Sequence, residues 1–225
     1  MNHTQKFLAA AAITFIGVSA ASAQTIVAGW DGGGSTPTVV DATKVTAALG
    51  TQGVSSFNWS GRSSTDGTWG SVSGPATVNN ANAWQVKGDL NQSQLFTITN
   101  TSGADLIFDS IHFDYAHIFG AITVNVTYVN GGLGLTDGTS LGSVSTNGSS
   151  PSLSDWDDAD FTIGSAAFAT LANNQSATFR FDITGAGTGG MDNIAISIVP
   201  EPSSYALISG CFLMGFVALR RRSRS

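Results

Sequence analysis

Apolar and polar side chains alternate with a period of two in three segments, and this alternation constrains the fold more than any other feature of the sequence. The segments are residues 121–129, 177–183 and 193–198. In the second, Phe179 and Phe181 fall on one side and polar residues on the other. Successive side chains of a strand point to opposite faces, so each segment is predicted to be a strand with one buried and one solvent-facing side. Three such strands predict antiparallel sheets packed face to face.

Shorter strand candidates fill most of the remaining central region. They are residues 25–30, 54–59, 83–87, 94–99, 106–115, 140–145 and 160–163. Gly, Asn, Asp and Ser, which favour turns, separate them, as at 130–132 and 137–138. Because no internal window has the periodicity of a helix, we predict an all-β domain over residues 24–199, an antiparallel and jelly-roll-like β-sandwich.

The acidic residues of this domain restrict its partners. Residues 24–199 contain fourteen Asp against four Lys and Arg, a formal charge of −10. Such a surface repels phosphate backbones, so nucleic acid is not an expected partner. The one Glu of the chain, Glu201, and its one Cys, Cys211, lie beyond the domain. The domain sequence therefore offers no disulfide, no thiol nucleophile and no Glu for acid–base catalysis.

Residues 1–23 have the parts of a secretory signal peptide in order. A basic residue precedes the apolar run 7–18, and small residues with Ala21 and Ala23 at the cleavage positions precede Gln24. The run is shorter than the about 20 residues that a membrane-spanning helix needs. We expect an N-terminal signal helix that directs the chain to the Sec translocon, and cleavage by signal peptidase after Ala23.

Residues 200–225 form a second segment that does not belong to the domain. Pro200, Glu201 and Pro202 end any preceding strand, because each proline lacks a backbone donor and restricts the backbone around it. The mostly apolar stretch 203–219 predicts a transmembrane helix about 25 Å long. A basic cluster follows it, formed by Arg220, Arg221, Arg222 and Arg224. Arginines stay on the cytoplasmic side, which places the domain outside the inner membrane.

This order of parts resembles the PEP-CTERM sorting signal of Gram-negative bacteria, and the resemblance covers residues 200–225. It implies recognition by an exosortase, a membrane-embedded cysteine protease, with cleavage near 200–202. It also implies an inner-membrane intermediate, then a cell-surface or extracellular product associated with exopolysaccharide or biofilm. An ordinary C-terminal anchor without processing satisfies the same topology rule and stays open as the alternative.

Carboxylates are densest in residues 155–160. They belong to Asp155, Asp157, Asp158 and Asp160. An EF-hand loop that began at the first of these would need Gly at its sixth position and Glu at its twelfth, where the chain has Asp160 and Ala166. That reading is excluded. An irregular Ca²⁺ site stays open beside the favoured interpretation, a solvated acidic loop, and no other cofactor is expected.

His112, Asp114 and His117 form the second group of ligating side chains. On a strand, His112 and Asp114 share one face, and we expect that face to be polar and solvent-facing. Zinc usually needs three or four ligands, and the domain has no further His. The sequence has one match to the Gly-x-Ser-x-Gly pentad of a serine hydrolase, at residues 138–142, but a predicted strand over 140–145 follows it where a nucleophile elbow would need a helix. We therefore predict no enzymatic activity.

Three tryptophans leave a second function open. Trp59, Trp69 and Trp156 stand among Gly, Ser, Asn and Asp, where an exposed ring could stack on a sugar. Packing of these large rings is the favoured interpretation, because Trp is usually well buried. A carbohydrate-binding, lectin-like module is therefore the alternative to a non-catalytic surface protein, and a glycoside hydrolase is less favoured.

Overall fold

The computed structural model describes the central part of the chain. The described residues are 24–31, 36–50, 58–60, 68–69, 72–73, 82–87, 91–151, 156–164 and 169–199. These residues include no helix that is long and apolar enough to cross a membrane. The signal peptide predicted for 1–23 and the sorting segment predicted for 200–225 lie outside the described residues, as do both expected terminal helices.

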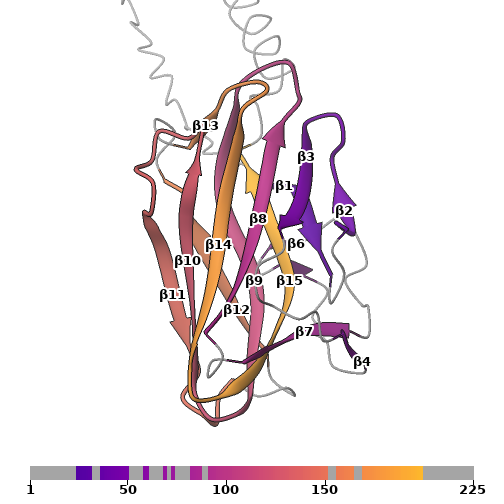
Figure 1. The fold of residues 1–225 in the computed structure, drawn as a ribbon. Coiled ribbons are helices and arrows are strands. Elements are labelled where there is room, and N and C mark those ends of the chain that lie inside the picture. Colours follow the sequence, from indigo (N-terminus) through magenta and orange to yellow (C-terminus); the bar gives the residue numbers. More distant parts are fainter. Residues whose placement is uncertain are drawn as a thin grey trace, which may run out of the picture.

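Two antiparallel sheets pack against each other (Figure 1). Sheet I has the strand order β12-β9-β15-β1-β2, with β13 paired to β9, β7 paired to β15 and β4 paired to β7. Its strands are β1 (Thr25–Trp30), β2 (Val39–Val40), β4 (Asn58–Ser60), β7 (Asn82–Lys87), β9 (Leu106–Phe119), β12 (Asp157–Thr162), β13 (Thr170–Leu171) and β15 (Thr188–Ile198).

Sheet II has the strand order β11-β10-β14-β8-β3. Its strands are β3 (Val45–Gly50), β8 (Gln92–Asn100), β10 (Ile122–Gly131), β11 (Ser140–Ser145) and β14 (Ser176–Gly185). A separate two-stranded sheet joins β5 (Thr68–Trp69) to β6 (Val72–Ser73). The predicted all-β sandwich of antiparallel sheets is confirmed, and its jelly-roll-like character stays a prediction.

The alternation in the sequence is confirmed in β10 and β14. These strands pair side by side, and buried residues alternate with partly buried ones along most of each strand. Polar residues on the outer side of β14 also pair with the neighbouring strand β8, as in the hydroxyl contact of 3.1 Å between Thr97 and Thr178. The period of two therefore predicted correctly which side of sheet II enters the core.

β15 departs from the expectation. All of its residues are buried, whereas the alternation predicted that Asn193 and Ser197 would face solvent. The outer face of sheet I is covered, because the fully buried Trp69 of β5 packs there with Ile26 and Ala195. A strand in the middle of a covered sheet is enclosed on both sides, so its polar residues enter a second buried layer.

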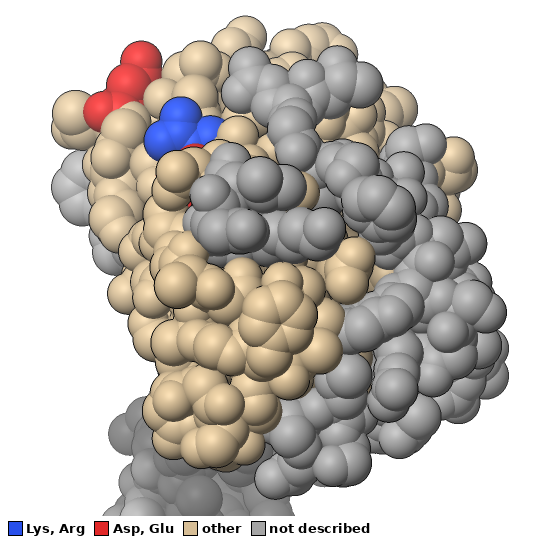
Figure 2. Space-filling model, turned by 60° about the horizontal axis from the view of Figure 1, so that its bottom comes forward, with Lys and Arg blue, Asp and Glu red and all other residues tan. Residues whose placement is uncertain are grey.

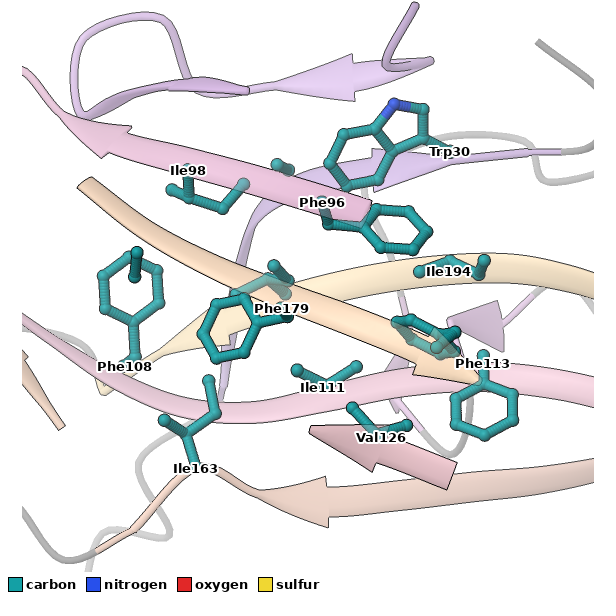
Figure 3. Close-up of a cluster of buried hydrophobic side chains, with 14 of the residues drawn as sticks. Trp30, Phe96, Ile98, Phe108, Ile111, Phe113, Val126, Ile163, Phe179 and Ile194 are labelled. Atoms are coloured by element: carbon teal, nitrogen blue, oxygen red, sulfur yellow. The ribbon is translucent and has the colours of Figure 1, made fainter. Parts of the chain in front are cut away.

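The main core lies between the sheets and is rich in aromatic rings (Figure 3). Phe113 of sheet I and Phe181 of sheet II meet edge to face, with ring centroids 5.2 Å apart and planes at 77°. Phe181 also contacts Phe96, whose ring packs against Trp30 at 5.2 Å. Burying a side chain of this kind contributes about 1.5–3 kcal/mol, so these rings hold the two sheets together.

The two ends of the sandwich are distinguished by the register of β15. At one end Thr25 of β1 pairs with Ile198, and at the other end Phe119 of β9 pairs with Thr188. The first is called the terminal end here, because the described chain enters and leaves the sheet there. The second, at the bottom of Figure 1, is called the distal end.

Candidate functional site

The outer face of β12, β9 and β15 holds most of the predicted site residues. The acidic segment was expected to be a loop, but residues 157–162 form β12, an edge strand of sheet I. In its register Asp158 lies opposite Asp114, and Asp160 lies opposite His112. Asp is depleted in strands, yet charges are tolerated at a sheet edge, where they also oppose pairing with another chain.

The carboxylates of β12 point to different partners. Asp157 accepts a hydrogen bond from the Tyr115 hydroxyl at 3.2 Å, and Asp160 contacts His112 Nδ1 at 2.5 Å. Asp155 lies outside the described residues. Among the residues that are described, no three His, Cys, Asp or Glu side chains form a group that could hold a metal ion. Asp157, Asp158 and Asp160, the three of these Asp that the structure describes, therefore do not form such a group.

Tyr115 owes its protonation behaviour to this environment. Burial of the phenol, together with the charge of Asp157 and the hydrogen bond to it, raises the pKa of Tyr115 to about 12. The hydroxyl is consequently protonated at every physiological pH. Tyr115 can therefore act as a permanent donor that orients the Asp157 carboxylate.

His112 is buried, which corrects the expectation of a solvent-facing polar strand. Its side chain is 1% exposed, and both ring nitrogens have partners. Nδ1 lies 2.5 Å from Asp160 Oδ1, and Nε2 lies 2.9 Å from the Ser197 hydroxyl oxygen. Because sheet I is covered on its outer side, the ring needs these two hydrogen bonds to offset its loss of water.

The order Ser197, His112, Asp160 is that of a hydrolytic triad, but the accessibility is reversed. In a hydrolase the serine faces the substrate and the carboxylate is buried. Here Ser197 is 0% exposed, whereas the Asp160 side chain is 39% exposed. The arrangement seen in this structure therefore links three strands and offers no exposed nucleophile. Sequence reasoning missed Ser197, because its partner lies 85 residues away along the chain.

Asp114 and Asp192 belong to the same buried layer. The Asn193 amide group donates to Asp114 Oδ2 at 2.8 Å, and the Asn193 backbone N–H donates to Asp192 Oδ1 at 2.9 Å. Asn193 has a φ of 47° and lies where the pairing of β15 with β9 shifts register between Asp192 and Ala195. This Asp-Asn pair therefore satisfies a backbone donor at a bulge within the strand.

His117, the remaining predicted ligand, lies near the distal end. It is 8% exposed, and its backbone N–H and its Nδ1 both contact the carbonyl oxygen of Pro151. These contacts fasten β9 to the loop that precedes β12. His117 therefore lies apart from His112, with a structural partner of its own.

The two tryptophans of this set whose side chains the structure describes lie in different environments. Trp69 is fully buried over Gly29, where a Cβ atom would come within 2.7 Å of the ring. This agrees with the favoured interpretation of packing and leaves no ring face for a sugar. The Trp59 side chain lies outside the described residues. Trp156 is partly exposed, and its ring lies over Gly190, where a Cβ atom would come within 2.6 Å of it. Of the described rings in this set, Trp156 alone keeps a surface for a ligand.

Comparisons with known proteins add little to this description. No protein family matches the chain, and neither does any curated protein. Among solved structures, the enzymatically active domain of bacteriophage CBA120 tailspike protein 4 is 11% identical, with a TM-score of 0.31, and the match covers 69% of this chain and 18% of that one. This chain therefore corresponds to a small part of that protein.

Two other solved structures are of more similar size. The K3 cleaved adhesin domain of Lys-gingipain from Porphyromonas gingivalis is 11% identical, with a TM-score of 0.35 and coverage of 69% of this chain and 91% of that one. TmCBM61, solved with β-1,4-galactotriose, is 14% identical, with a TM-score of 0.28 and coverage of 52% and 71%. Scores of this size carry no argument about function.

Proposed function

We propose that this chain is an exported surface protein of a Gram-negative bacterium, in which the β-sandwich is a non-catalytic cargo. The observation that carries the proposal is the order of parts after the domain: Pro200-Glu201-Pro202, the apolar stretch 203–219 and the cluster Arg220 to Arg222. The Sec translocon and signal peptidase act at the N-terminus. An exosortase acts at the C-terminus, and the product is associated with exopolysaccharide.

The position of the sorting motif suits a segment that is removed without damage to the fold. β15 ends at Ile198, and the Val199 N–H donates to the carbonyl oxygen of Ile107 at 2.9 Å. Pro200 follows directly and, lacking a backbone donor, cannot extend the ladder. Cleavage near 200–202 therefore leaves every described strand of the sandwich intact.

Cell fractionation tests the proposal. The chain is expressed in a strain that has an exosortase and in a matched strain that lacks it. We expect surface or medium localisation in the first strain and inner-membrane accumulation in the second. Glu201→Ala should accumulate in the membrane of both strains, whereas the control Asp137→Ala, in a turn of the sandwich, should behave as the wild type. Equal localisation in the two strains would refute exosortase processing.

Carbohydrate binding is the second candidate function, and the exposed part of Trp156 is the observation that favours it. The ring lies over Gly190, and the exposed carboxylate of Asp157 follows it in the chain. An aromatic surface beside a hydrogen-bonding group suits a sugar ring. A glycoside hydrolase is less favoured, because two carboxylates of β12 are already engaged, Asp157 with Tyr115 and Asp160 with His112.

A further inference from the structure

Phe119 is the exposed aromatic residue of the described chain. It ends β9 at the distal end, and 62% of its surface is exposed. Every other Phe, Trp or Tyr side chain whose exposure the structure describes is buried or partly buried. Single exposed apolar residues are common on protein surfaces, so the surroundings of Phe119 decide what its ring can do.

The backbone beneath Phe119 is held tightly. Gly120 has a φ of +65°, and a Cβ atom there would come within 2.9 Å of the Gly187 Cα atom. A Cβ atom on Gly187 would in turn come within 2.5 Å of the Gly120 carbonyl carbon, and the Gly187 N–H donates to the carbonyl oxygen of Ala121 at 3.0 Å. Two turns are thus packed backbone to backbone. The ring of Phe119 is presented from a fixed support rather than from a free loop.

Polar groups surround this support. The Ile122 N–H donates to Thr146 Oγ1 at 3.0 Å, which fixes the loop 146–151 beside the turn. In that loop Asn147 Oδ1 accepts from the Ser149 and Ser150 backbone N–H groups at 2.9 and 2.7 Å. All three of these residues are exposed. The Ser149 hydroxyl also donates to Asn147 Oδ1 at 2.9 Å. Amide and hydroxyl groups therefore lie at the same end of the sandwich as the ring.

The distal end carries little charge. The segments 118–122, 146–151 and 185–188 contain no Asp, Glu, Lys or Arg. Figure 2 brings this end of the molecule forward, and the charged side chains visible there lie at its upper left margin. Lys87 of β7 pairs with Thr188 at this end. One lysine on a domain of formal charge −10 does not favour a polyanion or a phosphate-bearing headgroup. The chemistry fits a neutral partner that offers both C–H and hydroxyl groups.

We propose that the distal end binds a neutral polysaccharide, with the ring of Phe119 stacked on a sugar ring and Asn147, Ser149 and Ser150 bonding its hydroxyls. The assignment rests on the proposed function for its orientation. If the chain is anchored through residues 203–219, the membrane lies beyond the terminal end. β9 then places Phe119 about 45 Å from that end at 3.3 Å per residue. In that form the ring points away from the lipid of the inner membrane.

Binding assays on the full-length, detergent-solubilised chain test this proposal. Affinity electrophoresis in gels that contain neutral β-glucan, xylan, galactan or mannan, with alginate as the anionic comparison, measures the interaction. The variants are Phe119→Ala, Phe119→Trp and the control Val40→Ala, which changes another exposed apolar residue, on β2. Thermal unfolding of each variant shows whether its fold is intact.

We expect retardation by at least one neutral polysaccharide and none by alginate. Phe119→Ala should weaken binding about tenfold or more, Phe119→Trp should keep it, and Val40→Ala should leave it unchanged. The inference is overturned if no neutral polysaccharide binds or if Phe119→Ala binds as the wild type does. If Trp156→Ala loses binding and Phe119→Ala keeps it, the sugar binds at Trp156, and the assignment to the distal end is overturned.

Two further results separate this inference from the sorting proposal. The processed protein, isolated from the cell surface, is also mixed with phosphatidylcholine vesicles. If it floats with the vesicles and the Phe119→Ala variant does not, the ring binds lipid and the polysaccharide assignment is overturned. Correct sorting of a Phe119→Ala chain that has lost polysaccharide binding would support both proposals. If the wild-type chain is sorted correctly but binds none of the polysaccharides, the binding proposed for the distal end is refuted and the sorting proposal stands.

Discussion

His112 and Ser197 lie on neighbouring strands of sheet I, with the imidazole Nε2 atom 2.9 Å from the serine hydroxyl oxygen and both residues 0% exposed. Asp160 occupies the other ring nitrogen, so hydrogen bonds join β12, β9 and β15 in one line. A buried polar group without its partner costs free energy that a solvated one does not. The line is therefore expected to matter for stability.

Truncation of the central ring should be the costliest change in this line. His112→Ala leaves a cavity and two unpaired groups, and we expect it to lower the free energy of unfolding by about 3 kcal/mol. Ser197→Ala removes one hydrogen bond and should cost about 1–2 kcal/mol. Urea unfolding measures both, with Ser143→Ala on the exposed edge strand β11 as the control. A His112→Ala chain as stable as that control would contradict the description.

The position of Trp156 predicts a coupling between two substitutions. Gly190→Ala should destabilise the chain by about 1–3 kcal/mol, because its Cβ would meet the Trp156 ring at 2.6 Å. In a Trp156→Ala background the same substitution should cost much less. Thermal unfolding of the two single variants and the double variant completes the cycle. Strictly additive effects would show that the ring does not lie over Gly190.

Substitution of the two described tryptophans of the outer layer should affect different properties, Trp69 mainly the free energy of unfolding and Trp156 mainly the affinity for sugars. Trp69→Ala removes a fully buried ring and should cost about 3–5 kcal/mol. Trp156→Ala removes a partly exposed one and should cost less, while lowering any affinity for sugars that involves sheet I. Chemical unfolding and the polysaccharide gels measure the two effects. Equal destabilisation by both substitutions would count against the contrast in burial.

Tyr115 predicts a loss of stability in alkali. Its pKa rises from 10.0 to about 12 on folding, so between these values the folded chain holds a proton that the unfolded chain has released. The contribution of this group is complete below pH 10 and is lost as the pH rises through about 12. Unfolding followed by urea at several pH values should show a steeper decline for the wild type than for Tyr115→Phe. Parallel curves would refute the link.

The sequence predicted the sheets better than their surroundings. The alternation around Phe179 and Phe181 follows from strand geometry, which is local, and it placed those rings in the core correctly. The burial of Ala195, which was expected on the solvent-facing side of its strand, depends on Trp69, a residue far away in the chain that packs on it. No local pattern encodes a contact of that kind, so the outer layer was expected to be solvated.

The candidate sites show the same contrast between local features, which the sequence predicts, and long-range features, which it does not. Turn chemistry correctly marked the ends of many strands. The strand predicted over 160–163 overlaps only the second half of β12, because the Asp-rich first half has a composition that edge strands tolerate and central strands do not. Phe119 was missed because an apolar residue at the end of a strand gives no sign of whether it is covered. Its exposure follows from the Gly120 turn, which ends the strand just beyond it.

Intact mass spectrometry of the surface-exposed protein tests the central claim most directly, because it reads both processing sites at once. The account predicts a chain that begins at Gln24, ends near Pro202 and lacks residues 205–225, in a strain that has an exosortase. In the strain without the enzyme, the same chain should begin at Gln24 and keep its C-terminal arginines. A surface form that retains Arg220 to Arg222 would contradict the claim.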